Sequence, residues 1–167
     1  IGANLIPYLA GSELYEIYTI DNESLGRLKY IDINGVTCIK GDILDAELIE
    51  EVLEGADTLV HLAADTRVMD SIENPDFNFR VNVEGTYNLL RQAQRSGVRK
   101  VINASTGGAI LGEIQPPVHE NMAPNPLSPY GASKLAVEGY CSAFSECYGL
   151  GAVSLRFSNI FGPRSFH

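Results

Sequence analysis

The residue types and spacing that bear most directly on chemistry lie in the segment Tyr130-Gly131-Ala132-Ser133-Lys134, at the start of a predicted helix. Residues four apart share one helical face, so the phenol of Tyr130 and the ammonium of Lys134 should be neighbours. Because a nearby cation favours a phenolate, we expect the pKa of Tyr130 to be lowered and Tyr130 to act as a base. A Tyr-x-x-x-Lys pair arises by chance in roughly one in five chains of this composition, so the pair alone is weak evidence.

Two hydroxyl residues precede a glycine turn in the segment 103–108, Asn-Ala-Ser-Thr-Gly-Gly. The segment ends a predicted buried strand, and open α/β sheets bind ligands outside the carboxyl ends of their strands. Ser105 or Thr106 could therefore hydrogen-bond the substrate oxygen from which Tyr130 takes a proton. A serine and threonine turn without chemistry is the alternative, and the pattern does not decide between the two hydroxyls.

Acidic residues follow two earlier strands. Asp21 comes 19 residues after Gly2, close to the ~20 residues that precede the ribose-binding acid of a dinucleotide site. A carboxylate there would repel a 2′-phosphate, which favours NAD over NADP. Asp42, followed by Ile43, could accept a hydrogen bond from an adenine amine. Both aspartates can also be simple turn or cap residues.

The segment His61-Leu62-Ala63-Ala64 ends a further strand, and its two alanines would let the backbone approach a dinucleotide closely. We expect His61 itself to be a packed strand residue rather than an acid or base. The other histidines, His119 and His167, lack the spacing and the cysteine neighbours of a ligand set, so no metal site is predicted.

The elements that must position these residues alternate between short β-branched runs and longer amphipathic segments, which is typical of βαβ units and a parallel sheet. Strands are predicted over residues 16–20, 36–40, 58–62, 100–104 and 152–157. Helices are predicted over residues 2–10, 45–53, 75–96 and 129–148, with Asp45 as an N-cap and with Gly55, Gly97 and Gly149 as terminators. Pro7 should kink or shorten the first helix, and residues 115–129, which contain five prolines, should form an ordered loop.

Composition excludes several classes of partner. The chain has 12 Lys and Arg against 21 Asp and Glu, a formal charge of −9, which would repel nucleic acid. No stretch approaches the ~18–20 apolar residues that cross a bilayer, so no membrane partner is expected. The three cysteines are odd in number and unpaired by spacing, which predicts a reducing, cytoplasmic location.

Taken together, these segments resemble the extended short-chain dehydrogenase/reductase family, specifically its NAD-dependent sugar-nucleotide epimerases and dehydratases. The resemblance covers nearly the whole chain. It is carried by Ile1-Gly2, Gly41-Asp42-Ile43, the segments 61–64 and 82–86, Ser105-Thr106, the segment 130–134 and the segment 156–164. Seven such motifs in the right order are far more specific than any one of them.

The resemblance implies that Tyr130 is the catalytic base, that Lys134 is its partner, and that Thr106, with Ser105 beside it, polarises the substrate. It implies that NAD is held by Gly2, Asp21, Asn22, Asp42, Ile43, Leu62, Ala63, Ala64, Tyr130, Lys134 and Phe157, and that Asn159 contacts the sugar nucleotide. Asn82 is implied to be structural, pinning backbone groups beneath the site. The implied activity is transient oxidation of a UDP-hexose at C4.

Departures from the family pattern narrow the reaction. The 4,6-dehydratases carry an acidic pair directly after the threonine, where this chain has Gly107-Gly108, so a 4-epimerase is favoured. A dehydratase, decarboxylase or reductase of the same family is an alternative, as is a non-catalytic NAD-binding scaffold, because fold alone does not fix function. Leu111 stands where many relatives carry tyrosine, which should alter the wall of the pocket.

The resemblance also implies how this chain is organised. Residues 1–167 should form one partial NAD-binding domain, a Rossmann-type doubly wound parallel sheet that lacks its first strand, expected just before Ile1, and the C-terminal sugar-nucleotide domain. Such a sheet should expose apolar surface and unpaired backbone. The helices over 75–96 and 129–148 could pair with their copies, so a homodimer is expected at full length.

Overall fold

Five parallel strands form the frame of the molecule, which the computed structural model describes over residues 1–163. They are β1 (Ile17–Asp21), β2 (Val36–Lys40), β3 (Thr58–His61), β4 (Lys100–Thr106) and β5 (Gly151–Phe157). β1 pairs with β2, while β4 pairs with β3 on one side and with β5 on the other. All five predicted strands are confirmed, with bounds that differ by two residues at most.

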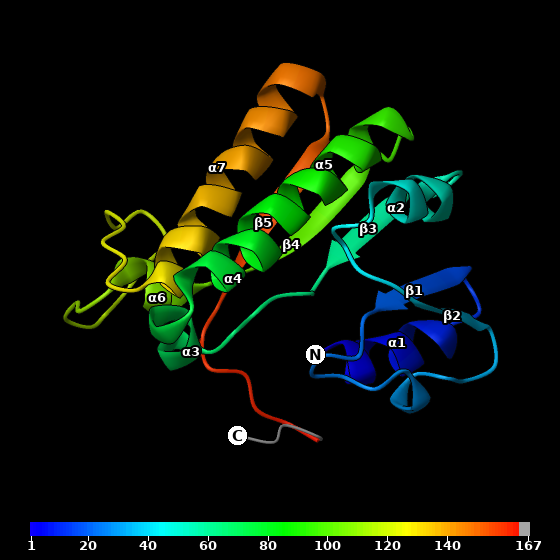
Figure 1. Ribbon diagram of the computed structural model, residues 1–167, viewed down its shortest axis with the longest axis horizontal. Helices are drawn as coiled ribbons and strands as arrows, with labels where there is room; N and C mark the ends of the chain where they lie inside the picture. The colour runs from blue at the N-terminus through cyan, green and yellow to red at the C-terminus, as the bar shows by residue number, and fades with distance from the viewer. Residues whose placement is uncertain (164–167) are drawn as a thin grey trace.

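The strands form two hydrogen-bonded sheets rather than one. Within residues 1–163, no ladder joins β1 to β3. A Rossmann sheet has the strand order 3-2-1-4-5-6, and the order here is the same with the place of strand 1 left between β1 and β3. Figure 1 shows the two parts side by side, with β1 closer than β2 to β3. The expected Rossmann-type sheet without its first strand is therefore confirmed.

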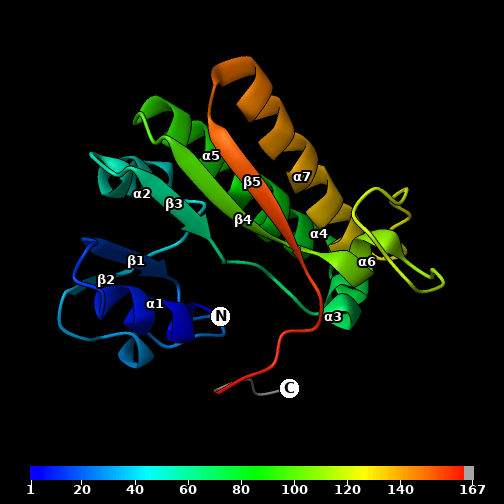
Figure 2. The same ribbon diagram turned by 180° about the vertical axis from the view of Figure 1, so that it is seen from behind.

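One face of the three-stranded sheet is covered by helices α5 (Gly85–Arg95) and α7 (Pro129–Tyr148), with α2 (Ala46–Leu53) packed beside α5 (Figure 1). The core lies between these helices and the strands, and includes Ile49, Leu53, Leu89, Leu90, Ala93, Val101, Val137 and Phe144. Figure 2 shows the opposite face, where no described helix lies over β4 and β5. Val60, Val153 and Leu155 are exposed, as expected for a sheet with one uncovered face.

The predicted helix ends agree closely with the structure. Asp45 caps α2 by accepting a hydrogen bond from the N–H of Leu48, and Gly149 ends α7 in the left-handed conformation that glycine adopts without strain. The first helix, α1 (Gly2–Ala10), continues through Pro7, so the proline does not end it. No helix among residues 1–163 has both the length and the apolar character needed to cross a membrane.

The helix predicted over residues 75–96 is not a single α-helix. It consists of α4 (Pro75–Phe79), a π-helical turn, η2 (Arg80–Glu84), and α5, and it stops before Gly97, whose φ is +75°. Three short helices were not predicted, η1 (Leu28–Tyr30), α3 (Val68–Glu73) and α6 (Gly107–Leu111). Helix α6 takes the place of the expected glycine turn, so the residues after Thr106 form a short α-helix.

Candidate active site

Tyr130 and Lys134 are neighbours on the first turns of α7, as their spacing predicts. The Nζ atom of Lys134 lies 6.0 Å from the centroid of the Tyr130 ring. Ser128 fixes the start of the helix by accepting a hydrogen bond from the N–H of Gly131 at 3.1 Å. The backbone N–H of Tyr130 donates to the hydroxyl of Ser71 on α3 at 3.2 Å. The pair is therefore held from two sides at the carboxyl end of β4.

Lys134 carries a buried amine. It is 6% exposed, and its Nζ donates to the backbone carbonyl of Ala104 on β4 at 2.9 Å. Burial lowers the pKa of Lys134 from 10.5 to about 8, because a charged ammonium loses its hydration there. The amine is thus tied to the end of the strand and is easier to deprotonate than an exposed lysine.

The expected lowering of the Tyr130 pKa is wrong for this structure. Burial of the phenol raises the pKa of Tyr130, a hydrogen bond with the Thr106 hydroxyl opposes that rise, and the carboxylate of Asp65 adds to it. Helical spacing reveals only the lysine as a neighbour of the phenol, and the Nζ of Lys134 donates to the Ala104 carbonyl. Desolvation and a nearby negative charge both disfavour a phenolate, and together they dominate.

The structure separates the two hydroxyls that the sequence left undecided. Thr106 is the last residue of β4, and its side chain hydrogen-bonds the phenol of Tyr130. Ser105 is 5% exposed and faces the helices, where its hydroxyl donates to Glu138 on α7 at 2.6 Å. Thr106 is therefore the hydroxyl that lies against Tyr130, whereas the hydroxyl of Ser105 is bonded to Glu138.

A buried asparagine holds the loop that follows β3. Asn82, in the π-helical turn, is 2% exposed. Its Oδ1 accepts from the N–H of Asp65 at 2.8 Å, and its Nδ2 donates to the carbonyl of Asp65 at 2.9 Å. This is the pinning of backbone groups expected of Asn82.

A second buried asparagine, which sequence reasoning missed, continues this network. Asn78 is fully buried; its Nδ2 donates to the carboxylate of Asp65 at 2.8 Å, and its Oδ1 accepts from Ser133 on α7 at 2.8 Å. Asp65 and Ser133 were also missed. The signal available was position, since Asp65 directly follows the segment 61–64 and Asn78 lies one helical turn before Asn82. The network ties the loop after β3 to the start of α7.

His61 is a packed strand residue, as expected. Its Nε2 lies 2.8 Å from the hydroxyl of Thr86, which itself donates to the carbonyl of Asn82. The histidine nitrogen must therefore be the donor of this pair. Burial, with a smaller effect from the charge of Lys134, lowers the pKa of His61 to about 3. His61 is neutral at physiological pH.

The residues expected to hold adenosine lie at the ends of β1 and β2. Asp21 accepts a hydrogen bond from the N–H of Glu23 at 2.6 Å. Asp42 accepts from the N–H of Leu44 at 3.0 Å and from the Nδ2 of Asn22 at 3.0 Å. Both aspartates are thus turn residues, which does not remove them from a ligand, because each carboxylate oxygen has two lone pairs.

The start of α1 faces the end of β3. A β-carbon at Gly2 would lie 3.7 Å from the side chain of Leu62, and no side chain caps the helix at Ile1. Uncapped N–H groups at a helix start bind phosphate well. Beyond Leu62, Ala63 and Ala64 present no bulky side chain. The groups that fit NAD are a carboxylate that can accept hydrogen bonds at the end of β1, the free N–H groups at the start of α1 beside β3, and the Tyr130 and Lys134 pair at β4.

The remaining predicted residues lie where the chain leaves β5. Phe157 pairs with Thr106 at the end of the strands, and Asn159 is exposed in the segment that follows. This segment returns to α1, where the Nδ2 of Asn4 donates to the carbonyl of Pro163 at 3.0 Å. Arg164 and His167 lie outside the described residues. Within residues 1–163, no group of three His, Cys, Asp or Glu could hold a metal ion.

The chain matches a known family and several curated proteins. The family described as the NAD dependent epimerase/dehydratase family matches residues 1–167. The chain is 34% identical to the UDP-glucose 4-epimerase of Mycolicibacterium smegmatis, over 98% of this chain and 54% of that protein. It is 37% identical to the dTDP-glucose 4,6-dehydratase of Streptomyces antibioticus, over 85% of this chain and 44% of that protein. The chain thus spans about half the length of the curated relatives it matches.

A solved structure of an epimerase has the same fold as this chain. The UDP-glucose 4-epimerase of Thermus thermophilus, solved as a complex with NAD, superposes with a TM-score of 0.92 at 38% identity. The match covers 98% of this chain and 53% of that one.

Proposed function

Because the chain belongs to the NAD-dependent epimerase/dehydratase family, we propose that it is the cofactor-binding, catalytic half of a sugar-nucleotide 4-epimerase that acts on a UDP-hexose. The observation that carries the proposal is the meeting of Tyr130, Lys134 and Thr106 at the carboxyl end of β4. A buried amine, a phenol and a hydroxyl at one strand end are the groups needed to move a proton to and from a sugar hydroxyl.

NAD would be held along the ends of the strands. The uncapped N–H groups at Gly2 would receive the diphosphate, Asp21 and Asp42 the adenosine, and Lys134 the ribose beside the nicotinamide. Asn22, Ile43, Leu62, Ala63, Ala64 and Phe157 would line this path. The bound cofactor supplies a hydride acceptor at the sugar carbon and returns the hydride afterwards.

In this proposal Tyr130 would take the proton of the C4 hydroxyl while the C4 hydride passes to the NAD⁺ that these residues would hold, which would leave a 4-keto sugar, and Thr106 would donate a hydrogen bond to the same oxygen. Lys134 supplies positive charge beneath the phenol, fixed by the Ala104 carbonyl. Tyr130 would give its proton back to the C4 oxygen when the keto sugar is reduced on the opposite face of C4, which would give the epimer. Asn159 is proposed to contact the nucleotide sugar from the segment after β5.

The residues after Thr106 favour epimerisation over dehydration. Gly107 and Gly108 begin α6, and a β-carbon at Gly108 would meet no atom within 4 Å. A dehydratase needs an acid and a base at this place to remove water from C5 and C6. Glycines provide neither. The proposed reaction therefore ends with a sugar that keeps all its hydroxyl groups.

The test is turnover by the full-length gene product with NAD, given UDP-glucose, UDP-galactose or UDP-N-acetylglucosamine. The expected product is the C4 epimer, resolved by chromatography. Tyr130→Phe should lower kcat by about 10²- to 10⁴-fold, whereas Tyr15→Phe, at an exposed tyrosine, should leave kcat unchanged. Unchanged sugar in every case would contradict the proposal. A stable keto or deoxy product, including one from dTDP-glucose, would identify a dehydratase, decarboxylase or reductase instead.

A non-catalytic NAD-binding scaffold is the remaining alternative. It predicts that the gene product binds NAD but that Tyr130→Phe restores every cellular phenotype of a deletion. The buried and hydrogen-bonded amine of Lys134 argues against it, because burying a charge without a catalytic use is costly.

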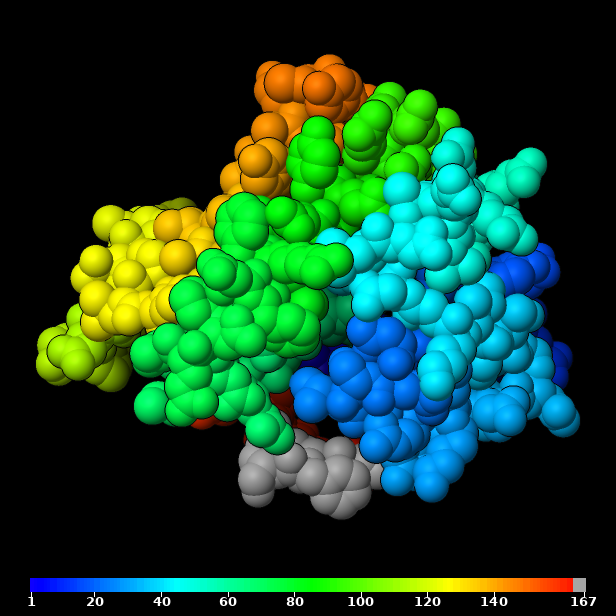
Figure 3. Space-filling model, viewed as in Figure 1, coloured from blue at the N-terminus to red at the C-terminus, as the bar shows by residue number. Residues whose placement is uncertain are grey.

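We also propose that the full-length protein is a homodimer formed through α5 and α7. Three tyrosines and a phenylalanine form a ring cluster on this face: Tyr87 and Tyr140 lie 5.4 Å apart by ring centroids, Tyr87 and Phe144 6.0 Å, and Phe144 and Tyr148 5.0 Å. The three tyrosines are exposed, and no described segment covers the two helices in Figure 3. Tyr140→Lys should convert a dimer to a monomer in light scattering; an unchanged mass would contradict the proposal.

A cytoplasmic location stays a prediction. Cys38, Cys141 and Cys147 are free thiols, which suits a reducing compartment. Fractionation of cells that express the tagged gene product would test it.

A further inference from the structure

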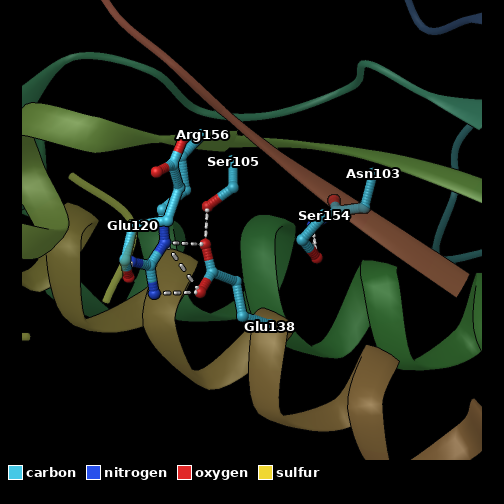
Figure 4. Close-up of polar contacts among 6 residues, drawn as sticks. All are labelled: Asn103, Ser105, Glu120, Glu138, Ser154 and Arg156. Carbon is cyan, nitrogen blue, oxygen red and sulfur yellow. Dashed lines mark hydrogen bonds and ion pairs between the residues drawn. The ribbon is translucent and has the colours of Figure 1, made fainter. Parts of the chain in front are cut away.

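Glu138 is the centre of a hydrogen-bonded network on the helix side of the sheet (Figure 4). Its Oε1 accepts from the Ser105 hydroxyl at 2.6 Å and from the Nε of Arg156 at 2.9 Å. Its Oε2 accepts from the Nη2 of Arg156 at 2.7 Å. The side chains of Arg156 and Glu138 are only 19% and 14% exposed. The carboxylate therefore has strong donors committed to both of its oxygens.

The network joins four separate segments. Ser105 comes from β4, Arg156 from β5 and Glu138 from α7, while the Nη1 of Arg156 donates to the carbonyl of Glu120 at 3.0 Å, in the loop after α6. The bonded residues lie 18 to 36 positions apart along the chain. One ion pair thus sets the position of α7, two strand ends and a loop relative to one another.

Stability alone does not explain a partly buried ion pair at this place. Taking both charges out of water costs about as much as their attraction returns, and apolar residues of similar size often serve as well. The same helix packs on the sheet through apolar contacts elsewhere, at Val137 and Phe144. What an ion pair with hydrogen bonds adds is a defined geometry, because guanidinium and carboxylate meet in few arrangements.

The ion pair between Glu138 and Arg156 bears on the position of Thr106, the residue after Ser105. Side chains alternate between the two faces of a strand, so fixing Ser105 toward Glu138 also fixes the direction of the next side chain, Thr106, which reaches the phenol of Tyr130 at the end of the strand. The register places Ser105 beside Arg156 and Thr106 beside Phe157. The network therefore holds the residues that immediately precede Thr106 and Phe157, the two strand-end residues at the proposed site.

We propose that Glu138 and Arg156, with Ser105, are positioning residues that hold the Thr106 hydroxyl against the phenol of Tyr130. The inference rests on the proposed function for its kinetic consequence, but not for its structural one. Glu138 and Arg156 touch neither substrate nor cofactor in this scheme, and they act only through the end of β4.

The sharpest variant is Glu138→Gln, which keeps the shape of the side chain and removes its charge. The carboxamide has only one acceptor oxygen and places an N–H₂ group next to Arg156. The paired hydrogen bonds from Arg156 and the hydrogen bond from Ser105 should therefore weaken. Ser145→Ala is the matched control, because Ser145 also joins α7 to β5, through the carbonyl of Leu150 and the N–H of Ala152, far from Thr106. If Glu138→Gln does not fold, Arg156→Lys gives the same test, since lysine keeps the charge and loses the bidentate fork.

The first measurement is the ionisation of Tyr130, followed by fluorine NMR of the full-length gene product labelled with 3-fluorotyrosine. Tyr130→Phe identifies the resonance by its loss. The hydrogen bond from Thr106 lowers the pKa of Tyr130, so loosening it should move the titration midpoint to higher pH in Glu138→Gln and leave it in place in Ser145→Ala. Asp65 after β3, whose charge raises the pKa of Tyr130, and Lys134 on α7, whose Nζ lies 6.0 Å from the centroid of the ring, are unchanged in both variants, and His61 on β3 stays neutral.

The second measurement is turnover with NAD and a UDP-hexose. Glu138→Gln should lower kcat by about ten- to a hundred-fold, the loss expected when a reacting group is misplaced by about 1 Å, with a smaller change in KM. The acid limb of the kcat profile should move to higher pH with the NMR midpoint. A merely structural role would instead lower the melting temperature and the active fraction together, without moving either midpoint.

An NMR midpoint for Tyr130 that is the same in Glu138→Gln and in the parent overturns the positioning role, whether or not turnover is observed. A parent that turns over no nucleotide sugar overturns the proposed function, and the NMR result then still decides the positioning role. The two failures are therefore distinguishable.

Discussion

Replacing Lys134 with methionine should make the protein more stable at pH 7 and nearly inactive. Methionine fills most of the volume of the lysine stem and carries no charge. The pKa of Lys134 falls from 10.5 to about 8 through burial, which corresponds to roughly 3 kcal/mol, since each pKa unit is worth about 1.4 kcal/mol. The hydrogen bond to the Ala104 carbonyl returns about 1.5 kcal/mol of this cost. Lys134→Met should therefore gain about 1 to 2 kcal/mol.

The sign follows from proton linkage. A lysine whose folded pKa lies below its unfolded pKa costs stability while it is charged in both states, below about pH 8. The cost is relieved as the pH rises from about 8 toward 10.5, because the unfolded chain there binds more protons than the folded one. The stability of the parent relative to Lys134→Met should therefore rise over that interval.

The assay is chemical denaturation followed by circular dichroism, at several pH values, for the parent and the variant. Taking the difference removes the contribution of Tyr130, whose pKa is raised by burial. The contribution of Cys141 does not cancel, because Lys134 lowers the pKa of Cys141, and the loss of this effect in the variant adds to the expected rise in the same direction. Lys40→Met is the matched control: its side chain is 69% exposed in an ion pair with Glu23, and it should change stability by less than about 1 kcal/mol. A variant that is less stable than the parent at pH 7, with no pH dependence of the difference, would refute the argument.

Three further predictions concern neighbouring residues. Asp65→Asn should lower the pKa of Tyr130 and move the acid limb of kcat to lower pH, because it removes the negative charge that opposes a phenolate; a limb that moves upward would contradict this. Gly131→Ala should cost about 1 to 3 kcal/mol or more, because its β-carbon would collide with the backbone carbonyl of Ala109, whereas Gly139→Ala on the same helix has open space and should gain about 0.5 to 1 kcal/mol in thermal unfolding. The free energy of unfolding should fall by as much as roughly 5 kcal/mol as the pH drops from 6.5 toward 3, because His61 stays neutral only when folded; acid titration of His61→Leu should show a flatter profile than the parent.

Local patterns were enough to predict most elements. The strands are short and β-branched, and α2 and α7 begin at a capping residue and end before a glycine, so the signal lies within a few residues of each element. The π-helical turn at 80–84 carries no such signal. At Gly85, just after it, a β-carbon would meet the side chain of Ile43 at 2.5 Å, which is a contact between distant parts of the chain that no local pattern contains.

The neighbouring positions of Tyr130 and Lys134 could be predicted from the sequence, but the direction of the Tyr130 pKa shift could not. Helical spacing alone brings Tyr130 beside Lys134. The direction of the Tyr130 pKa depends instead on how deeply the phenol is buried and on Asp65, which reaches it from another loop. Likewise, the side chains of Ser105 and Thr106 leave β4 in different directions. Which of the two meets Glu138 is decided by the packing of α7 against the strand.

The gap in strand order between β1 and β3 affects how residues 1–167 should behave as a purified polypeptide. The edges of β1 and β3 that face the gap carry N–H and C=O groups without ladder partners within the described residues. Open edges in the middle of a sheet, unlike natural outer edges, have no inward-pointing charge, bulge or proline to discourage pairing. Each is a template for any extended peptide, so such material should self-associate, and a short strand-forming peptide added in excess is the simplest means of keeping it dispersed.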